Sequence, residues 1–172
     1  MQLPIQPPFP PMEARNAARL PEGNDWIYEP KWDGFRGLAF RKDGEVLIQS
    51  KAGQPLGRYF PELVEALQGL PPKQFVLDGE IVILSGGHLD FNALLQRIHP
   101  AESRIRKLSK ETPVTFLCFD LLVDNGGHVQ TDRSLKERKE ALVQFFEEIP
   151  KKGTVRLSPY TSDLPVAERW MG

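Results

Sequence analysis

A lysine flanked by two carboxylates stands out in the segment Glu-Pro-Lys-Trp-Asp-Gly-Phe-Arg at residues 29–36. In an extended segment Glu29, Lys31 and Asp33 point to the same face, because strand side chains alternate. A lysine so placed is either one member of a surface ion pair, which contributes little to stability, or an amine positioned for chemistry. The following Gly34 permits a turn or the close approach of a ligand to the backbone.

A second pair of carboxylates lies within the apolar run Val-Leu-Asp-Gly-Glu-Ile-Val at residues 76–82. Asp78 and Glu80 share one face of the expected strand, and two such carboxylates disfavour each other's ionised form unless a cation or a hydrogen-bond donor lies nearby. This face is either exposed to solvent or binds a ligand. Mg²⁺ and ribose hydroxyls are the candidate ligands, because hard oxygen donors suit Mg²⁺.

A third apolar run, Phe-Leu-Cys-Phe-Asp-Leu-Leu at residues 116–122, carries two aromatic side chains. On composition alone the aromatic residues favour core packing over a stacking surface. Cys118 is interpreted as a small buried hydrophobic residue. It is the only cysteine in the sequence, which excludes an intramolecular disulfide and a multi-cysteine metal site.

The elements that must hold these residues are predicted from periodicity and turn residues. Asp43-Gly44 indicates a tight hairpin, Asp90 caps a helix, and Ser134 with Glu137 forms a capping-box pattern. Strands are expected over 26–28, 35–40, 46–48, 75–84, 114–123 and 154–157, and helices over 61–67, 91–98, 101–110, 134–148 and 165–170. Regular βαβ alternation is missing, so the fold class expected is α+β, with antiparallel sheets flanked by helices.

Composition narrows the class of protein. The chain has 172 residues, of which 40% are hydrophobic and 26% charged, the balance of a globular protein with one main domain. The net charge of −1 excludes a globally basic nucleic-acid-binding protein but leaves room for a local basic face. No apolar run approaches a membrane helix and the start lacks a signal-peptide pattern, so we expect a cytoplasmic protein.

Two groups of basic residues are candidates for such a face. Interleaved glutamates favour solvated helix surfaces instead. The two groups are Arg104, Arg106, Lys107 and Lys110, and Lys136, Arg138 and Lys139.

Prolines dominate the beginning of the chain. Residues 1–24 hold many of the 16 prolines, which preclude a continuing helix and favour an extended arm. Leu3, Ile5 and Phe9 supply apolar anchors, so we expect this arm to pack over the domain, with a disordered tail as the alternative.

Four motifs follow one another along the chain: Lys-Trp-Asp-Gly-x-Arg at 31–36, Ser-Lys-Ala-Gly at 50–53, Asp-Gly-Glu at 78–80 and Phe-Asp-Leu-Leu at 119–122. In this order they resemble the ATP-dependent DNA ligases, and more closely the adenylation domain of the short bacterial ligases of repair and end joining. Pro11-Met12 and the runs at 58–62 and 89–100 also match that group. RNA ligases and capping guanylyltransferases share the lysine motif, but the context of Lys31 and the run ending at Pro100 favour a DNA ligase.

The resemblance implies the fold of the DNA ligase and mRNA-capping nucleotidyltransferases, which is ATP-grasp-like. It also implies that Lys31 attacks the α-phosphorus of ATP, with Mg²⁺ present, to form lysyl-AMP. AMP would then pass to the 5′-phosphate of nicked or broken double-stranded DNA, and the 3′-hydroxyl would displace it. End-joining proteins are the partners this implies, in a bacterial cytoplasm near the nucleoid and without a membrane.

Further residue roles come only from the resemblance. Asp78 receives no role. By similarity, Glu29 contacts the adenine amino group, Arg36 the ribose, Lys51 a phosphate or the nucleotide, Glu80 the ribose or the catalytic metal, and Phe119 stacks on the purine in place of the core role expected from composition.

The chain departs from the family pattern in two respects. Lys51 stands where the family usually has arginine, which keeps the charge but loses the planar, bidentate phosphate contact. The family's later Glu-Gly strand, Lys-x-Lys strand and OB-fold domain are not found. Residues 25–172 are therefore expected to form a partial adenylation domain, truncated and incomplete for ligation alone. A non-catalytic nucleotide- or DNA-binding fragment and a purely structural remnant are the alternatives.

Overall fold

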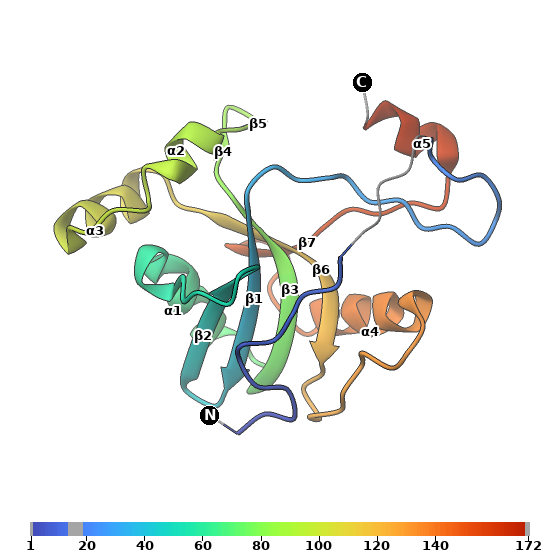
Figure 1. Ribbon diagram of the computed structural model, residues 1–172, viewed down its shortest axis with the longest axis horizontal. Helices are drawn as coiled ribbons and strands as arrows, with labels where there is room; N and C mark the ends of the chain where they lie inside the picture. The colour runs from blue at the N-terminus through green and yellow to red at the C-terminus, as the bar shows by residue number, and fades with distance from the viewer. Residues whose placement is uncertain (1, 14–18, 171–172) are drawn as a thin grey trace.

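The computed structural model describes residues 2–13 and 19–170, which build a five-stranded sheet with helices around it (Figure 1). The strands lie in the order β2-β1-β3-β6-β7, and every neighbouring pair is antiparallel except β6 and β7. The expected α+β class is confirmed, with one parallel edge. The strands are β1 (Phe35–Lys42), β2 (Glu45–Ser50), β3 (Gln74–Val82), β6 (Thr115–Val123) and β7 (Val155–Leu157), and a separate ribbon pairs β4 (Leu84–Ser85) with β5 (His88–Leu89).

The helices begin where local sequence signals place them. The Asp90 carboxylate accepts from the Ala93 N–H at 2.8 Å, and Ser134 and Glu137 form both hydrogen bonds of a capping box. In the view of Figure 1, α2 and α3 lie to the left of the sheet, and α4 and α5 lie to its right. The helices are η1 (Gly57–Tyr59), α1 (Pro61–Gly69), α2 (Phe91–Leu95), α3 (Glu102–Glu111), α4 (Leu135–Glu147) and α5 (Leu164–Arg169).

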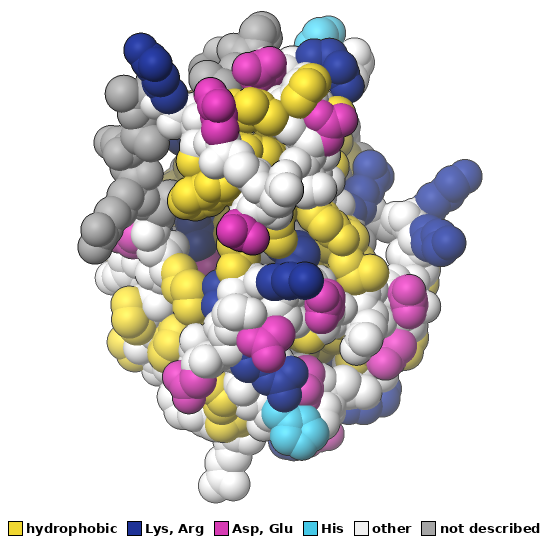
Figure 2. Space-filling model, turned by 90° about the vertical axis from the view of Figure 1, so that its right-hand side faces the viewer, with side chains coloured by type: hydrophobic (Ala, Val, Ile, Leu, Met, Phe, Trp, Pro, Cys, Tyr) yellow, Lys and Arg dark blue, Asp and Glu magenta, His cyan; other side chains and the backbone are white. Residues whose placement is uncertain are grey.

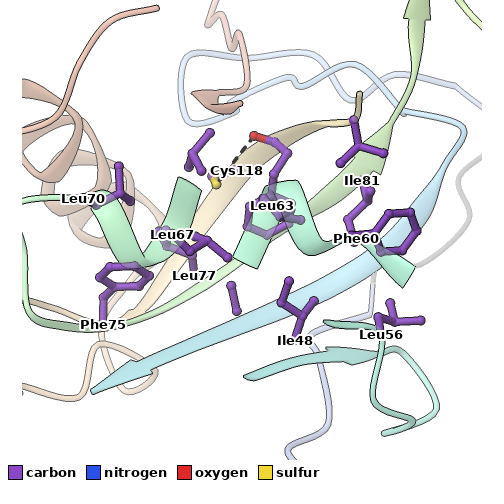
Figure 3. Close-up of a cluster of buried hydrophobic side chains, with 14 of the residues drawn as sticks. Ile48, Leu56, Phe60, Leu63, Leu67, Leu70, Phe75, Leu77, Ile81 and Cys118 are labelled. Carbon is purple, nitrogen blue, oxygen red and sulfur yellow. Dashed lines mark hydrogen bonds between the residues drawn. The ribbon is translucent and has the colours of Figure 1, made fainter. Parts of the chain in front are cut away.

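One face of the sheet carries the main hydrophobic core. Leu63 and Leu67 of α1 lie over sheet residues such as Leu77 and Ile81 (Figure 3), and Leu142 and Phe145 of α4 join the same cluster. The Cys118 thiol is buried there and donates to the Phe116 carbonyl at 3.9 Å. Cys118 is 0% exposed, which confirms it as a core residue, and this burial raises the pKa of its thiol well above the ordinary value.

The opposite face of the sheet is covered in part by the N-terminal segment. Leu3 and Ile5 are buried against Leu38, Phe40 and a few further residues of β3 and β6. The described part of the expected arm, residues 2–13 and 19–24, has no helix, as the prolines predict. The same prediction also falls on residues 1 and 14–18, which lie outside the described residues.

Two sequence runs that matched the ligase pattern meet in space. The Arg97 guanidinium binds both carboxylate oxygens of Glu62 in α1, at 2.7 and 2.8 Å, and also the Tyr59 carbonyl. Arg97 is fully buried, so this charge-assisted contact fixes the connection between α2 and α3 against α1.

Two strand predictions were wrong. Residues 26–28 form no strand, and only an isolated bridge joins Tyr28 to Thr161. The strand expected over 75–84 ends at Val82, and Leu84 belongs to the short β4–β5 ribbon. In both cases the side-chain pattern predicted a strand. The backbone of residues 26–28 instead pairs with a loop, and the backbone after Val82 turns back on itself in the short ribbon.

Candidate active site

The segment that carries Lys31 is irregular and is anchored by the chain that follows β7. Tyr28 and Thr161 exchange two backbone hydrogen bonds, at 2.8 and 3.0 Å, and the Trp32 indole N–H donates to Ser158 Oγ at 2.8 Å. Lys31 itself is exposed, and the described residues offer it no ion-pair partner. The anchors on both sides of Lys31 therefore fix its backbone and leave its amine accessible.

Gly34 ends this segment at a place where no side chain fits. A Cβ atom on Gly34 would lie 2.3 Å from the Ile81 carbonyl oxygen and 2.9 Å from a Val82 methyl group. Gly79 in β3 is similarly confined, since its Cβ would lie 2.6 Å from the Leu117 carbonyl oxygen. Close backbone approach thus explains the glycine in each of the two charged motifs.

Arg36 is the central cation of the site. Its guanidinium binds the Asp78 carboxylate through two nitrogens, at 2.5 and 2.7 Å, and lies 4.5 Å from the centroid of the Phe119 ring. Arg36 pairs directly with Glu80 across β1 and β3, so both side chains point to the same face of the sheet. Asp78, which had no role from the sequence, is buried as the partner that orients Arg36.

An open pocket of about 450 Å³ lies beside this cluster. Arg36, Lys51 and Glu80 line it together with Gly34. Lys51 is exposed on the turn after β2 and pairs with Glu13 of the N-terminal segment at 3.0 Å. The structure therefore brings Arg36, Lys51 and Glu80 to one pocket, at the end of the segment that carries Lys31.

Glu80 has an environment that disfavours its ionised form. Burial raises the pKa of Glu80 to about 7, although the Arg36 charge and a hydrogen bond from the Gly34 backbone lower it. Within the described residues no group of three or more His, Cys, Asp and Glu side chains is arranged to hold a metal ion. The Asp78 carboxylate is bound to Arg36, so Glu80 is the one carboxylate of this pair available to Mg²⁺. A single carboxylate is compatible with a Mg²⁺ ion whose other ligands are mainly substrate phosphates.

The helix α4 contributes two buried basic side chains, which contact Glu29 and residues of β6. Lys139 is 3% exposed, and its Nζ donates to Glu29 at 2.6 Å and to the Phe119 carbonyl at 2.5 Å. The Arg138 Nε binds the Asp120 carboxylate at 3.0 and 3.1 Å. Both residues were expected on a solvated helix face, and that interpretation was wrong because their carboxylate partners lie under the helix.

A sequence signal for the burial of Arg138 does exist. Arg138, Leu142, Phe145 and Ile149 recur at the spacing of one helix face, and all four are buried. A cation on an apolar helix face requires a buried partner. The basic residues of α3 do match the expectation, because Arg106 and Lys107 are exposed and pair with glutamates of their own helix.

The side of the molecule toward α4 and α5 is shown in Figure 2. Lys and Arg side chains on it are interspersed with Asp and Glu, and hydrophobic side chains are exposed between them.

None of the helices in residues 2–13 and 19–170 is long and apolar enough to cross a membrane.

Solved structures define the class of protein to which this fold belongs. The ligase domain of LigD from M. tuberculosis matches 85% of this chain and 45% of its own with a TM-score of 0.62 at 23% identity. A mycobacterial DNA ligase D complexed with ATP and MES matches with a TM-score of 0.59. The fold is that of the adenylation domain of DNA ligases.

Sequence comparison narrows this class to a family. Residues 11–172 match the model of the ATP dependent DNA ligase domain, so the chain belongs to the ATP-dependent DNA ligase family. DNA ligase C of Mycobacterium tuberculosis is 45% identical over 99% of the chain, and DNA ligase C2 of Mycolicibacterium smegmatis is also 45% identical. The chain spans about half the length of these curated relatives, 47% of each.

Proposed function

We propose that this chain is the ATP-binding part of a DNA ligase adenylation domain, in which Lys31 accepts AMP from ATP. One observation carries the proposal. The anchored segment with the exposed Lys31 ends at Gly34, beside a pocket lined by Arg36, Lys51 and Glu80. Two cations and an acidic group thus line one pocket, and the segment that carries the nucleophilic amine ends beside it.

The reaction would begin with the neutral Lys31 amine attacking the α-phosphorus, with pyrophosphate as the leaving group. Lys51 would contact a phosphate, and its single ammonium group would do so without the bidentate geometry of arginine. Arg36 would contact the ribose from the position in which Asp78 holds it.

The base would lie near Phe119 and Glu29. Arg36 covers one face of the Phe119 ring, so the purine would stack on the other face. Glu29 would accept a hydrogen bond from the adenine amino group. Its carboxylate lies close to Phe119, since Lys139 contacts both residues.

Glu80 would hold Mg²⁺ together with the phosphates of ATP, or contact the ribose. When bound, Mg²⁺ offsets charge on the phosphates and favours departure of pyrophosphate. The Glu80 carboxyl must then be ionised, and the neighbouring Arg36 favours that state.

Nicked or broken double-stranded DNA is the substrate we propose for the second step, within the bacterial cytoplasm. The multifunctional non-homologous end joining protein LigD of Mycobacterium bovis, 30% identical over 69% of the chain, supports a link to end joining and to its partner proteins. That relative is matched over 14% of its length.

Transfer of a labelled phosphate tests this function. The protein is incubated with Mg²⁺ and ATP labelled at either the α- or the γ-phosphorus, and then with a nicked duplex. We expect label on the protein from α-labelled ATP and none from γ-labelled ATP. GTP labelled at the α-phosphorus should give less label than ATP. The label should leave the protein when the nick carries a 5′-phosphate. Equal labelling from both positions of ATP would contradict nucleotidyl transfer.

A further inference from the structure

Lys139 connects the two parts of the proposed base site. Its Nζ donates to the Glu29 carboxylate and to the main-chain carbonyl of Phe119, so one buried ammonium joins the irregular segment 26–34 to β6. The Tyr160 ring lies 5.5 Å from the same Nζ. A buried cation with two oxygen acceptors and an aromatic neighbour has little freedom to move.

We infer that Lys139 is a positioning residue that sets nucleobase selectivity by holding Glu29 as a hydrogen-bond acceptor. This inference rests on the proposed function, because it needs the base to lie between Glu29 and Phe119. Lys139 itself does not touch the nucleotide in this arrangement. It acts through the side chain of Glu29 and the backbone of Phe119.

The selectivity follows from donor and acceptor chemistry. Adenine presents a 6-amino group, which donates, whereas guanine presents a 6-oxo group, which accepts. An ionised carboxylate only accepts, so it binds the adenine amino group and opposes the guanine oxygen. A protonated carboxyl group can donate, and it would accommodate guanine.

The charges around Glu29 make Lys139 the residue that decides between these states. Burial raises the pKa of Glu29, and Lys139 from α4 is the strongest of the groups that lower it. Asp120 from β6 raises this pKa, and Arg36 from β1 lowers it more weakly. Without Lys139, the carboxyl group would face Asp120 and the distant Arg36, and protonation would be favoured.

Equilibrium binding of nucleotide analogues tests the inference. We would use ATP and GTP analogues with a methylene group between the α- and β-phosphorus, from which no AMP can be transferred. Dissociation constants would be measured for the parent chain, Lys139→Met, Lys139→Arg and the matched control Lys136→Met, which removes an exposed lysine of the same helix.

The adenine analogue should bind the parent at least about tenfold more tightly than the guanine analogue, since one charge-assisted hydrogen bond separates them. In Lys139→Met this preference should fall about tenfold, and guanine binding should strengthen as pH is lowered and Glu29 gains a proton. Lys139→Arg should restore the preference, and Lys136→Met should leave it unchanged.

A second variant tests the inference if Lys139→Met does not fold. In the double variant Glu29→Gln with Lys139→Met, no charge is left buried at these two positions, and an amide either donates or accepts. It should bind both analogues about equally.

The outcomes separate the two proposals. A parent that binds neither analogue would overturn the proposed function, and the inference with it. A parent that prefers adenine, together with a Lys139→Met protein or a double variant that keeps this preference, would overturn only the role of Lys139. A loss of thermal stability without a change of preference would show that Lys139 is merely structural.

Discussion

At the scale of single residues, Arg36 depends on Asp78 for its orientation. Asp78→Asn keeps the shape of the side chain but removes the charge from a buried carboxylate that binds two guanidinium nitrogens. We expect the free energy of unfolding to fall by about 2 kcal/mol, because hydrogen bonds to charged groups are lost. Arg36 would then turn toward Glu80, its cross-strand neighbour, and ATP binding should weaken.

Chemical denaturation and a nucleotide-binding titration measure these two effects. Asp132→Asn is the matched control, since Asp132 is exposed. Equal stability of the two variants would show that Asp78 does not orient Arg36 through its charge.

The confinement of Gly34 gives a prediction for the motif that carries Lys31. In Gly34→Ala the new Cβ would lie 2.3 Å from the Ile81 carbonyl oxygen, so either the segment or β3 must shift. We expect a loss of about 2–3 kcal/mol in the free energy of unfolding, and a shift of the segment that carries Lys31 relative to the pocket. Gly44→Ala has no atom within 4 Å of its Cβ and should leave both properties unchanged.

Thermal denaturation and labelling of Lys31 by ATP would be compared for these two variants. If Gly34→Ala behaved like Gly44→Ala, close packing would not explain the glycine of the lysine motif.

The raised pKa of Glu80 predicts that the free energy of unfolding depends on pH, and this dependence can be measured without metal. Its pKa is raised from 4.5 to about 7 in the folded protein, so between these values the folded state holds more protons than the unfolded state. The contribution of Glu80 to the free energy of unfolding is therefore highest below pH 4.5 and falls as pH rises through about 7. Glu80→Gln lacks this titration.

Urea denaturation in EDTA across this pH range measures the effect. The parent should lose stability relative to Glu80→Gln as pH rises. Parallel curves for the two proteins would show that burial does not raise the pKa of Glu80.

At the scale of elements, α4 is the helix that supplies the buried cations Arg138 and Lys139. Its capping box satisfies backbone donors at the first turn, just before Arg138 and Lys139. Ser134→Ala removes this cap and should lower the free energy of unfolding by about 1 kcal/mol. Ser103→Ala in the first turn of α3 is the control, since Ser103 is exposed. Thermal denaturation of the two variants decides whether the cap contributes, and equal melting temperatures would contradict it.

Local signals predicted the elements well where one short pattern determines the backbone. The Asp43-Gly44 hairpin joins β1 and β2 as expected, with Asp43 at a positive φ of 53°. Residues 26–28 were misassigned because their single bridge, to Thr161, depends on a pairing more than a hundred residues away. Such long-range contacts leave no periodicity in the sequence.

The candidate site was predictable in part for the same reason. Motif order placed Arg36, Lys51 and Glu80, and the structure brings these three to one pocket. The partners Asp78 and Lys139 were missed, since a carboxylate or an amine in a sequence does not reveal which charge it will meet. The role of each residue toward ATP stays a prediction.

At the scale of the whole molecule, the N-terminal segment covers part of the second face of the sheet. Leu3 and Ile5 are buried against Leu38 and Phe40 of β1. Ile5→Ala should cost about 2 kcal/mol or more in the free energy of unfolding, because it leaves a cavity against the sheet. Gln2→Ala changes an exposed residue of the same segment and should cost little. Denaturation midpoints in urea compare them, and a neutral Ile5→Ala would show that the segment is not packed in solution.

The central claim is that Lys31 accepts AMP from an ATP molecule bound beside it, at the pocket lined by Arg36, Lys51 and Glu80. Intact mass measured after incubation with ATP and Mg²⁺ tests it most directly, with Lys31→Ala measured in parallel. We predict that the parent gains the mass of one adenylyl group and that Lys31→Ala gains none. An unchanged mass of the parent, or a gain that Lys31→Ala retains, would contradict the assignment of Lys31 as the acceptor.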